Sequence, residues 1–258
     1  YEVPTPGYLI LVAPPHQRLR YGMAGMASLS EELLEGKENA PDSAPEMTAG
    51  ASCEKVLSET KSRQLYGDGP EYWDLRYKVD PEPFEWLRSY SDLKEFITCG
   101  KDADILHVGC GNSLLTEEMY DEGFHHIINI DTSPVVITQM IERNMDRHEM
   151  IWLEMDACDM PLPSNAFDLI IDKSLMDTFA CSEDVAENMF MYLTRVSHVL
   201  RTGGTFLVIS YGAPENRLDF LKMSLLKFEV DVVKLEASVT QKEHYLYRCI
   251  KQPHVKKR

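Results

Sequence analysis

Residues 104–113 read DILHVGCGNS, and residues 127–131 read IINID. Each begins with a short apolar run typical of a buried strand, and the runs end in a glycine pair and in a carboxylate. Between them, residues 113–122 have the pattern of a helix that stops at Gly123. A strand, a glycine turn, a helix and a second strand form the repeating unit of a parallel sheet covered by helices.

The same alternation continues along the chain. Strands are predicted over 151–155, 167–171 and 205–210, and helices from Pro134 onward and over 184–200. Two more strands, 228–235 and 245–250, follow with no helix between them, so we expect them to pair antiparallel at an edge. The predicted fold class is α/β: a Rossmann-like, doubly wound, mostly parallel seven-stranded sheet with an antiparallel edge strand and helices on both faces.

The domain is predicted to occupy residues 66–258, after a flexible N-terminal extension over 1–65. Residues 27–63 are rich in Ser, Glu, Ala and Thr and lack a sustained apolar period. The first 63 residues hold 9 acidic and 6 basic side chains, so most of the net charge of −16 falls on the domain. The negative net charge of the domain argues against direct nucleic-acid binding, which needs clustered Lys and Arg. It is suited to attracting a basic protein substrate by long-range electrostatics, or simply to solubility.

Composition also bears on membrane binding, metal binding and the cellular compartment. The longest apolar runs, such as 8–15, fall well short of a membrane span, so no membrane partner is expected. The six cysteines and eight histidines show no zinc spacing, so no metal is expected. Reduced thiols predict a cytoplasmic protein, with a mitochondrial targeting peptide near the start as the alternative, and we expect a monomer.

Ligands of such sheets bind beyond the carboxyl ends of the strands. Gly109 and Gly111 end the first predicted strand, and Asp131, Asp156 and the pair Asp172-Lys173 end the next three. Asp131 lies 22 residues after Gly109, close to the spacing of about 20 expected for an acid that binds ribose hydroxyls. Leu114 replaces the third glycine of the dinucleotide pattern, which favours a nucleoside without a pyrophosphate. S-adenosylmethionine fits, with Asp131 on its ribose, Asp156 on its adenine and the glycine loop near its methionine end.

Two runs carry a more specific resemblance: DILHVGCGNSLLTEEMYDEGFHHIINIDTSPVVITQM and MDACDMPLPSNAFDLIIDKSLMDTF. With EYWDLRY at 71–77 and PFEW at 83–86, they resemble the seven-β-strand methyltransferases, and within these the lysine methyltransferases of elongation factor 1-alpha. The resemblance covers roughly residues 70–210. It implies cofactor contacts at Trp73, Tyr77, Trp86, Gly109, Asp131, Thr132, Asp156, Ala157 and Lys173. It further implies that 71–77 folds over the cofactor as a lid, with Arg76 paired to the cofactor carboxylate.

A lysine ammonium must lose a proton before it can accept a methyl group. We expect Asp172 and Asp177 to hold the ammonium and to take its proton, and Tyr211 to be a hydrogen-bonding partner. The chain departs from the family at Ser174, where Gly usually follows Asp-Lys, so the acceptor end is less determined than the cofactor end. The expected function is transfer of a methyl group to a lysine of elongation factor 1-alpha. The alternatives are a methyltransferase of a small molecule or of another protein such as citrate synthase, and a non-catalytic cofactor-binding scaffold.

Overall fold

The computed structural model describes residues 69–237 and 242–253. The predicted extension over 1–65 lies outside these residues. The described helices are α4 (Gly69–Val79), α5 (Tyr90–Leu93), the short 3-10 helix η2 (Lys94–Phe96), α6 (Leu115–Asp121), α7 (Pro134–Arg143), α8 (Leu175–Phe179), α9 (Val185–Val199) and α10 (Pro214–Leu221). The strands are β1 (Ile105–Val108), β2 (Ile127–Asp131), β3 (Ile151–Glu154), β4 (Phe167–Lys173), β5 (Leu200–Ser210), β6 (Phe228–Leu235) and β7 (His244–Lys251).

The seven strands form one sheet in the order β3-β2-β1-β4-β5-β7-β6. Strands β1 to β5 are parallel, while β7 runs antiparallel to both β5 and β6. The predicted fold class is confirmed, and the reversed strand is β7, one position in from the edge. Eight residues lie between the end of β6 and the start of β7. This length favours the antiparallel arrangement, because a parallel link needs a crossover of a dozen or more residues.

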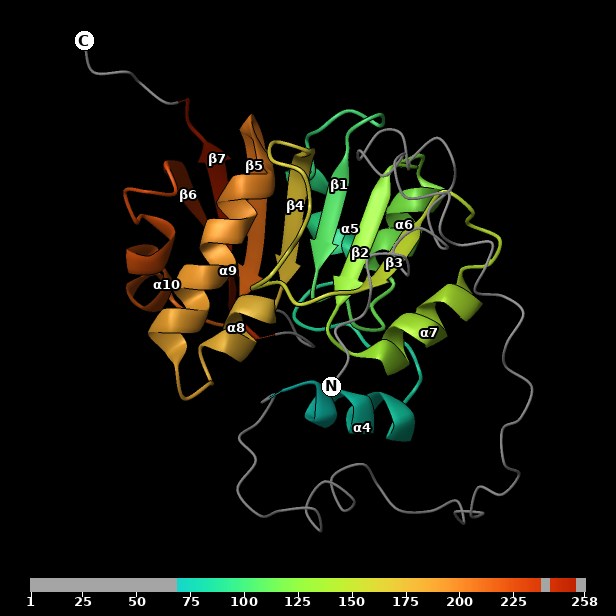
Figure 1. The fold of residues 1–258 in the computed structure, drawn as a ribbon. Coiled ribbons are helices and arrows are strands. Elements are labelled where there is room, and N and C mark those ends of the chain that lie inside the picture. Colours follow the sequence, from blue (N-terminus) through green and yellow to red (C-terminus); the bar gives the residue numbers. More distant parts are fainter. Residues whose placement is uncertain (1–68, 238–241, 254–258) are drawn as a thin grey trace. The chain divides into compact units, whose positions relative to one another are not determined.

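Helices cover both faces of the sheet (Figure 1). Behind the sheet in this view, Leu115 and Met119 of α6 and Leu93 of α5 pack in one cluster with Ile105 of β1 and Ile171 of β4. In front of it lies α9, whose buried residues are Met189, Tyr192, Leu193, Val196 and Val199. This helical spacing matches the apolar positions that predicted the helix. Strand β1 is buried along its whole length, as expected for a strand with helices on both sides.

Helix α4 occupies the end of the sheet toward which β2 runs (Figure 1). It comprises the segment that the family resemblance assigned to a lid, and it contacts α7. Tyr77 is its buried residue and packs in one cluster with Val136, Met140 and Trp152, with Trp73 alongside. The helix is thereby held over the place where a ligand of this fold binds.

One predicted boundary is wrong. The sequence placed a helix up to residue 200 and a strand from 205, separated by Gly203-Gly204, whereas α9 ends at Val199 and β5 begins at once with Leu200. The glycines lie inside the strand, where the pairing of β4 with β5 shifts register and Gly203 has φ +81°. Glycine in a strand interior commonly marks such an irregularity. Among the described helices, none has the length and apolarity needed to cross a bilayer.

Candidate functional site

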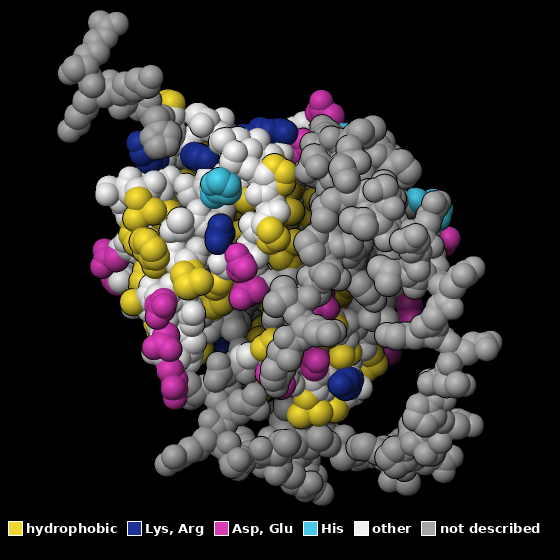
Figure 2. Space-filling view, viewed as in Figure 1, with side chains coloured by type: hydrophobic (Ala, Val, Ile, Leu, Met, Phe, Trp, Pro, Cys, Tyr) yellow, Lys and Arg dark blue, Asp and Glu magenta, His cyan; other side chains and the backbone are white. Residues whose placement is uncertain are grey.

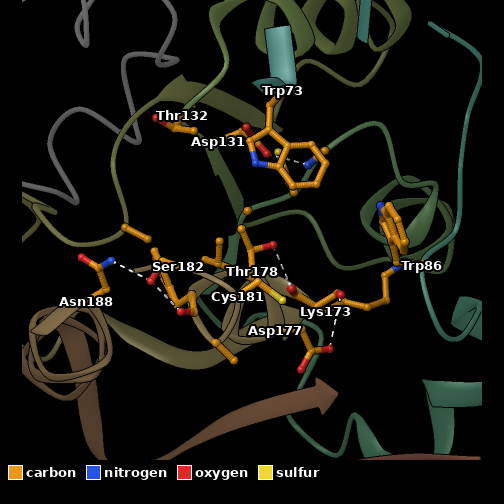
Figure 3. A pocket seen from close by; sticks show the side chains of 18 of the residues that line it. Trp73, Trp86, Asp131, Thr132, Lys173, Asp177, Thr178, Cys181, Ser182 and Asn188 are labelled. Atoms are coloured by element: carbon orange, nitrogen blue, oxygen red, sulfur yellow. Dashed lines mark hydrogen bonds between the residues drawn. The ribbon is translucent and has the colours of Figure 1, made fainter. Parts of the chain in front are cut away.

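A cavity of about 850 Å³ opens at the carboxyl ends of β1, β2 and β4. Its lining comes from α4, the segment before α5, the glycine loop (residues 109–113), the ends of β2 and β4, α8, α9 and α10. In Figure 3, Trp73, Asp131 and Lys173 come from separate elements and surround one space, with Asp177 and Asn188 further along it. The predicted site residues found in the lining are Trp73, Tyr77, Trp86, Gly109, Gly111, Asp131, Thr132, Asp156, Ala157, Lys173, Asp177 and Tyr211.

The two glycines of the glycine loop have a backbone conformation that is strained for any other residue, and little space for a side chain. Gly109 and Gly111 have φ of +59° and +51°, a left-handed conformation that favours glycine. A Cβ at Gly109 would stand 3.0 Å from Leu175, and one at Gly111 would stand 2.8 Å from the Tyr77 hydroxyl. The loop backbone is therefore packed closely against α8 on one side and against α4 on the other.

Two carboxylates mark the end of the cavity near β2 and β3. Asp131 is buried; one oxygen accepts the Gly111 N–H at 2.9 Å and the other accepts the Ser133 N–H at 3.0 Å. Burial raises the pKa of Asp131, and these N–H groups oppose the shift. Asp156 is exposed and accepts the Cys158 N–H at 2.8 Å. The structure thus brings both predicted nucleoside-binding acids to one cavity and orients each through backbone donors.

The aromatic residues of the predicted lid also border the cavity. Trp73 and Tyr77 stack with ring centroids 6.0 Å apart. Arg76 is not among the residues that line the cavity: its guanidinium lies 5.4 Å from the ring centroids of both Phe84 and Trp86. Its position supports a role in holding residues 84–86 against α4 rather than the predicted contact with a cofactor carboxylate.

Lys173 ends β4 with only 2% of its side chain exposed, and its Nζ donates to the carboxylate of Glu85. Glu85 also accepts from the Ser113 hydroxyl at 2.8 Å and from the Leu114 N–H. Burial lowers the pKa of Lys173, and Glu85 opposes this shift. Glu85 was not predicted as a site residue, although it lies inside the PFEW segment that carries the family resemblance.

Asp172 takes a different place from the one predicted. It is fully buried and is not part of the cavity lining. Its carboxylate accepts the N–H groups of Leu175 at 2.8 Å and Met176 at 3.1 Å, and the Tyr192 hydroxyl at 2.7 Å. Burial raises its pKa to about 7. Asp172 therefore caps the start of α8 from inside the fold and lies apart from the cavity in which the acceptor end was expected.

Asp177 lines the cavity but is not a free carboxylate. It accepts from Arg217 at 2.8 Å, from the Tyr211 N–H at 2.9 Å and from the Ser210 hydroxyl. Arg217 was not predicted, and no motif around it signals a functional role. Tyr211 is exposed at the cavity and packs edge-on against His244, with ring centroids 4.7 Å apart.

Ser174, which stands where the resembling family usually has glycine, has an unusual backbone conformation. Ser174 has φ +77°, in the left-handed region that favours glycine. The family's usual glycine would adopt this conformation freely, so the loop geometry explains the family pattern, and the serine keeps the turn at a conformational cost. Within the described part of the chain, no cluster of three or more His, Cys, Asp or Glu residues is arranged to hold a metal ion.

Residues 106–208 match the methyltransferase domain family. The matched stretch runs from β1 into β5 and so includes the glycine loop and the strand ends that line the cavity. The sequence is 39% identical over 170 residues to the eEF1A lysine and N-terminal methyltransferase homolog of Drosophila melanogaster, covering 62% of this chain and 24% of that one. It is 31% identical over 161 residues to EEF1A lysine methyltransferase 4 of Mus musculus, covering 57% and 63%.

Among solved structures, the fold is similar to the N-methyltransferase NodS from Bradyrhizobium japonicum in complex with S-adenosyl-l-homocysteine. The TM-score is 0.50 at 17% identity, covering 62% of this chain and 83% of that chain. This likeness concerns the fold. The chain spans about a quarter of the length of the Drosophila relative that it matches.

Proposed function

We propose that the protein transfers a methyl group from S-adenosylmethionine to a lysine side chain of elongation factor 1-alpha. The observation that carries the proposal is the single cavity that joins a nucleoside-binding end, with the glycine loop, Asp131 and Asp156, to a polar end with Asp177 and Tyr211. The curated relatives named as eEF1A lysine methyltransferases support the choice of substrate.

The residues at the first end fit the cofactor. The left-handed turn at Gly109 and Gly111 places the loop backbone in the cavity lining, where Tyr77 packs against Gly111. Asp131 has both oxygens oriented by backbone donors and keeps lone pairs for the ribose hydroxyls, while the exposed Asp156 suits the adenine amino group. When bound, S-adenosylmethionine supplies an electrophilic methyl group.

The rest of the chemistry falls to the protein. Trp73, Tyr77 and Trp86 form an aromatic wall that excludes water and offers ring faces to a cationic sulfur centre. At the far end, Thr178, Ser182, Asn188 and Asn216 offer neutral polar groups. Each oxygen of the Asp177 carboxylate accepts two hydrogen bonds: Oδ1 from Arg217 and Ser210, and Oδ2 from two neutral donors at longer distances, the Tyr211 N–H at 2.9 Å and the Ser174 hydroxyl at 3.4 Å. We infer that Oδ2 receives the acceptor ammonium and its proton, which leaves a neutral amine aligned for in-line attack.

The surface near this end suits a basic protein segment. The acidic residues Glu183, Asp184, Glu187, Glu215 and Asp219 are exposed along α9, α10 and the connection before α9. No Lys or Arg occurs between residues 174 and 194. Figure 2 shows acidic side chains gathered over the α8–α9 end of this face. Such a surface attracts a lysine-bearing segment by long-range electrostatics, which favours a protein acceptor over a small neutral molecule.

The test combines the purified chain, tritiated S-adenosylmethionine and purified elongation factor 1-alpha, with a cell extract in parallel. We expect label in elongation factor 1-alpha, on one lysine located by mass spectrometry, and none with an Asp131→Ala variant. Label confined to another protein or to small molecules would overturn the proposed substrate while keeping the reaction. Cofactor binding without any label would point to a non-catalytic scaffold.

A further inference from the structure

Residues 82–86, here called the strap, are fixed to three parts of the cavity wall. The Asn112 side chain donates to the Glu82 carbonyl at 2.6 Å, which attaches the strap to the glycine loop. Arg76 of α4 lies over the rings of Phe84 and Trp86. Glu85, which lies between these two residues in the sequence, accepts hydrogen bonds from Lys173 at the end of β4, from the Ser113 hydroxyl and from the Leu114 N–H. One carboxylate thus connects the strap, the glycine loop and the sheet.

The position of Lys173 identifies the kind of ligand group that it would meet. In the sheet, β1 lies between β2 and β4, so Asp131 and Lys173 flank the glycine loop from opposite sides. A ligand whose ribose lies at Asp131 therefore extends across the loop toward Lys173. Among the residues that line the cavity, the cationic side chains are Lys173 and Arg217, and Arg217 is bound to Asp177 at the acceptor end. A nucleoside methyl donor without phosphates has one anionic group, the carboxylate of its amino acid end.

The charge of Lys173 depends on its surroundings. Burial lowers its pKa, whereas Glu85 and, more weakly, Glu118 of α6 raise it. Burial and, in the same direction, the positive charge of Lys173 lower the pKa of the His107 imidazole on β1 to about 3, so this imidazole is neutral near pH 7. Glu85 is therefore the main partner that keeps a proton on a side chain almost closed off from water.

We propose that Glu85 is a positioning residue for the amino acid end of the methyl donor: it holds the Lys173 ammonium, in its charged form, toward the cavity, where that ammonium binds the donor carboxylate. The inference rests on the proposed function, because it assumes a nucleoside donor with an amino acid end. It adds a role for a residue that does not itself line the cavity.

The experiment measures binding by calorimetry, with two probes that share the nucleoside. S-adenosylhomocysteine has the amino acid end, and 5′-methylthioadenosine lacks it. In Glu85→Gln we expect the Kd for S-adenosylhomocysteine to rise about tenfold at pH 7.5, while the Kd for 5′-methylthioadenosine stays within twofold of the wild type. The loss should grow from pH 7 to pH 9, because Lys173 without Glu85 loses its proton at lower pH. Glu82→Gln is the matched control: the same charge is removed from the same strap, but that side chain is exposed, and both affinities should stay unchanged.

Equal weakening of both probes in Glu85→Gln would overturn the proposal, since the residue would then merely hold the strap in place. Unchanged binding of S-adenosylhomocysteine would overturn it as well. Should Glu85→Gln fail to fold by circular dichroism, Lys173→Gln decides, because it must lose affinity for S-adenosylhomocysteine and keep it for 5′-methylthioadenosine. A wild-type chain that binds neither probe would instead refute the proposed function, and so the two failures are distinguishable.

Discussion

Asp177→Asn tests how the acceptor end of the cavity is built. The substitution keeps the size of the side chain but removes its charge, next to an arginine with 9% of its side chain exposed. The single side-chain oxygen of the asparagine can still accept hydrogen bonds from some of the donors, which include Arg217, Ser210 and the Tyr211 N–H. The guanidinium, however, is left without a counter-charge in a nearly closed site.

The expected loss of stability follows from the burial of the Asp177–Arg217 ion pair. Breaking a buried ion pair by removing one partner costs about 3–5 kcal/mol, and the side-chain exposures of 13% and 9% place this pair close to that class. With one acceptor oxygen retained, we expect the free energy of unfolding to fall by about 3 kcal/mol. For a domain of this size that corresponds to a Tm lower by roughly 6–12 °C. The double variant Asp177→Asn/Arg217→Gln removes the unpaired charge and should recover about half of the loss.

The assay is urea denaturation followed by circular dichroism, with S-adenosylhomocysteine affinity measured alongside. That affinity should stay near the wild-type value, because the pair lies at the acceptor end. The exposed Asp219→Asn on α10 is the control and should change stability by less than about 0.5 kcal/mol. The reasoning is refuted if Asp177→Asn is as stable as the wild type, or if the double variant loses the sum of the two single losses.

Three further predictions concern the buried carboxylate of Asp172, the glycine loop and Trp73 of α4. The pKa of the Asp172 carboxyl is about 7 in the folded protein, against an ordinary value of 3.8. Because the folded state binds this proton more tightly than the unfolded state, the free energy of unfolding should fall as the pH rises from about 4 to 7. In urea titrations, Asp172→Asn should remove about 2–3 kcal/mol of the change in the free energy of unfolding between pH 5 and 8. A variant with the same pH dependence as the wild type would contradict the raised pKa of Asp172. Gly111→Ala would place a Cβ against the Tyr77 hydroxyl at a left-handed φ, so Tm and S-adenosylhomocysteine affinity should both decrease; wild-type affinity would show that the contact is easily relieved. Trp73→Ala should weaken S-adenosylhomocysteine binding and methyl transfer while the chain stays folded by circular dichroism, and an unchanged Kd would count against the lid.

The sequence alone predicted the sheet and placed several of the residues that line the cavity at one edge of it, because both depend on local patterns. Short apolar runs between helical periods predict buried strands, and the strand ends of a parallel sheet meet at one edge. Gly109, Gly111, Asp131 and Asp156 could therefore be assigned to one cavity before any contact was known. The aromatic residues Trp73, Tyr77 and Trp86 came from the family resemblance instead, since nothing in their spacing requires a ligand.

The tertiary structure decided which charged groups pair. Glu85 and Lys173 are 88 residues apart, and Asp177 and Arg217 are 40 apart. No periodicity or motif links such residues, because only the packing of separate elements brings them together. The same holds for Asp172, which the sequence places at a strand end like Asp131, yet which turns into the core to cap α8. Side-chain alternation at the end of a strand depends on register and on the helix that follows, and these are settled only when the whole sheet is assembled.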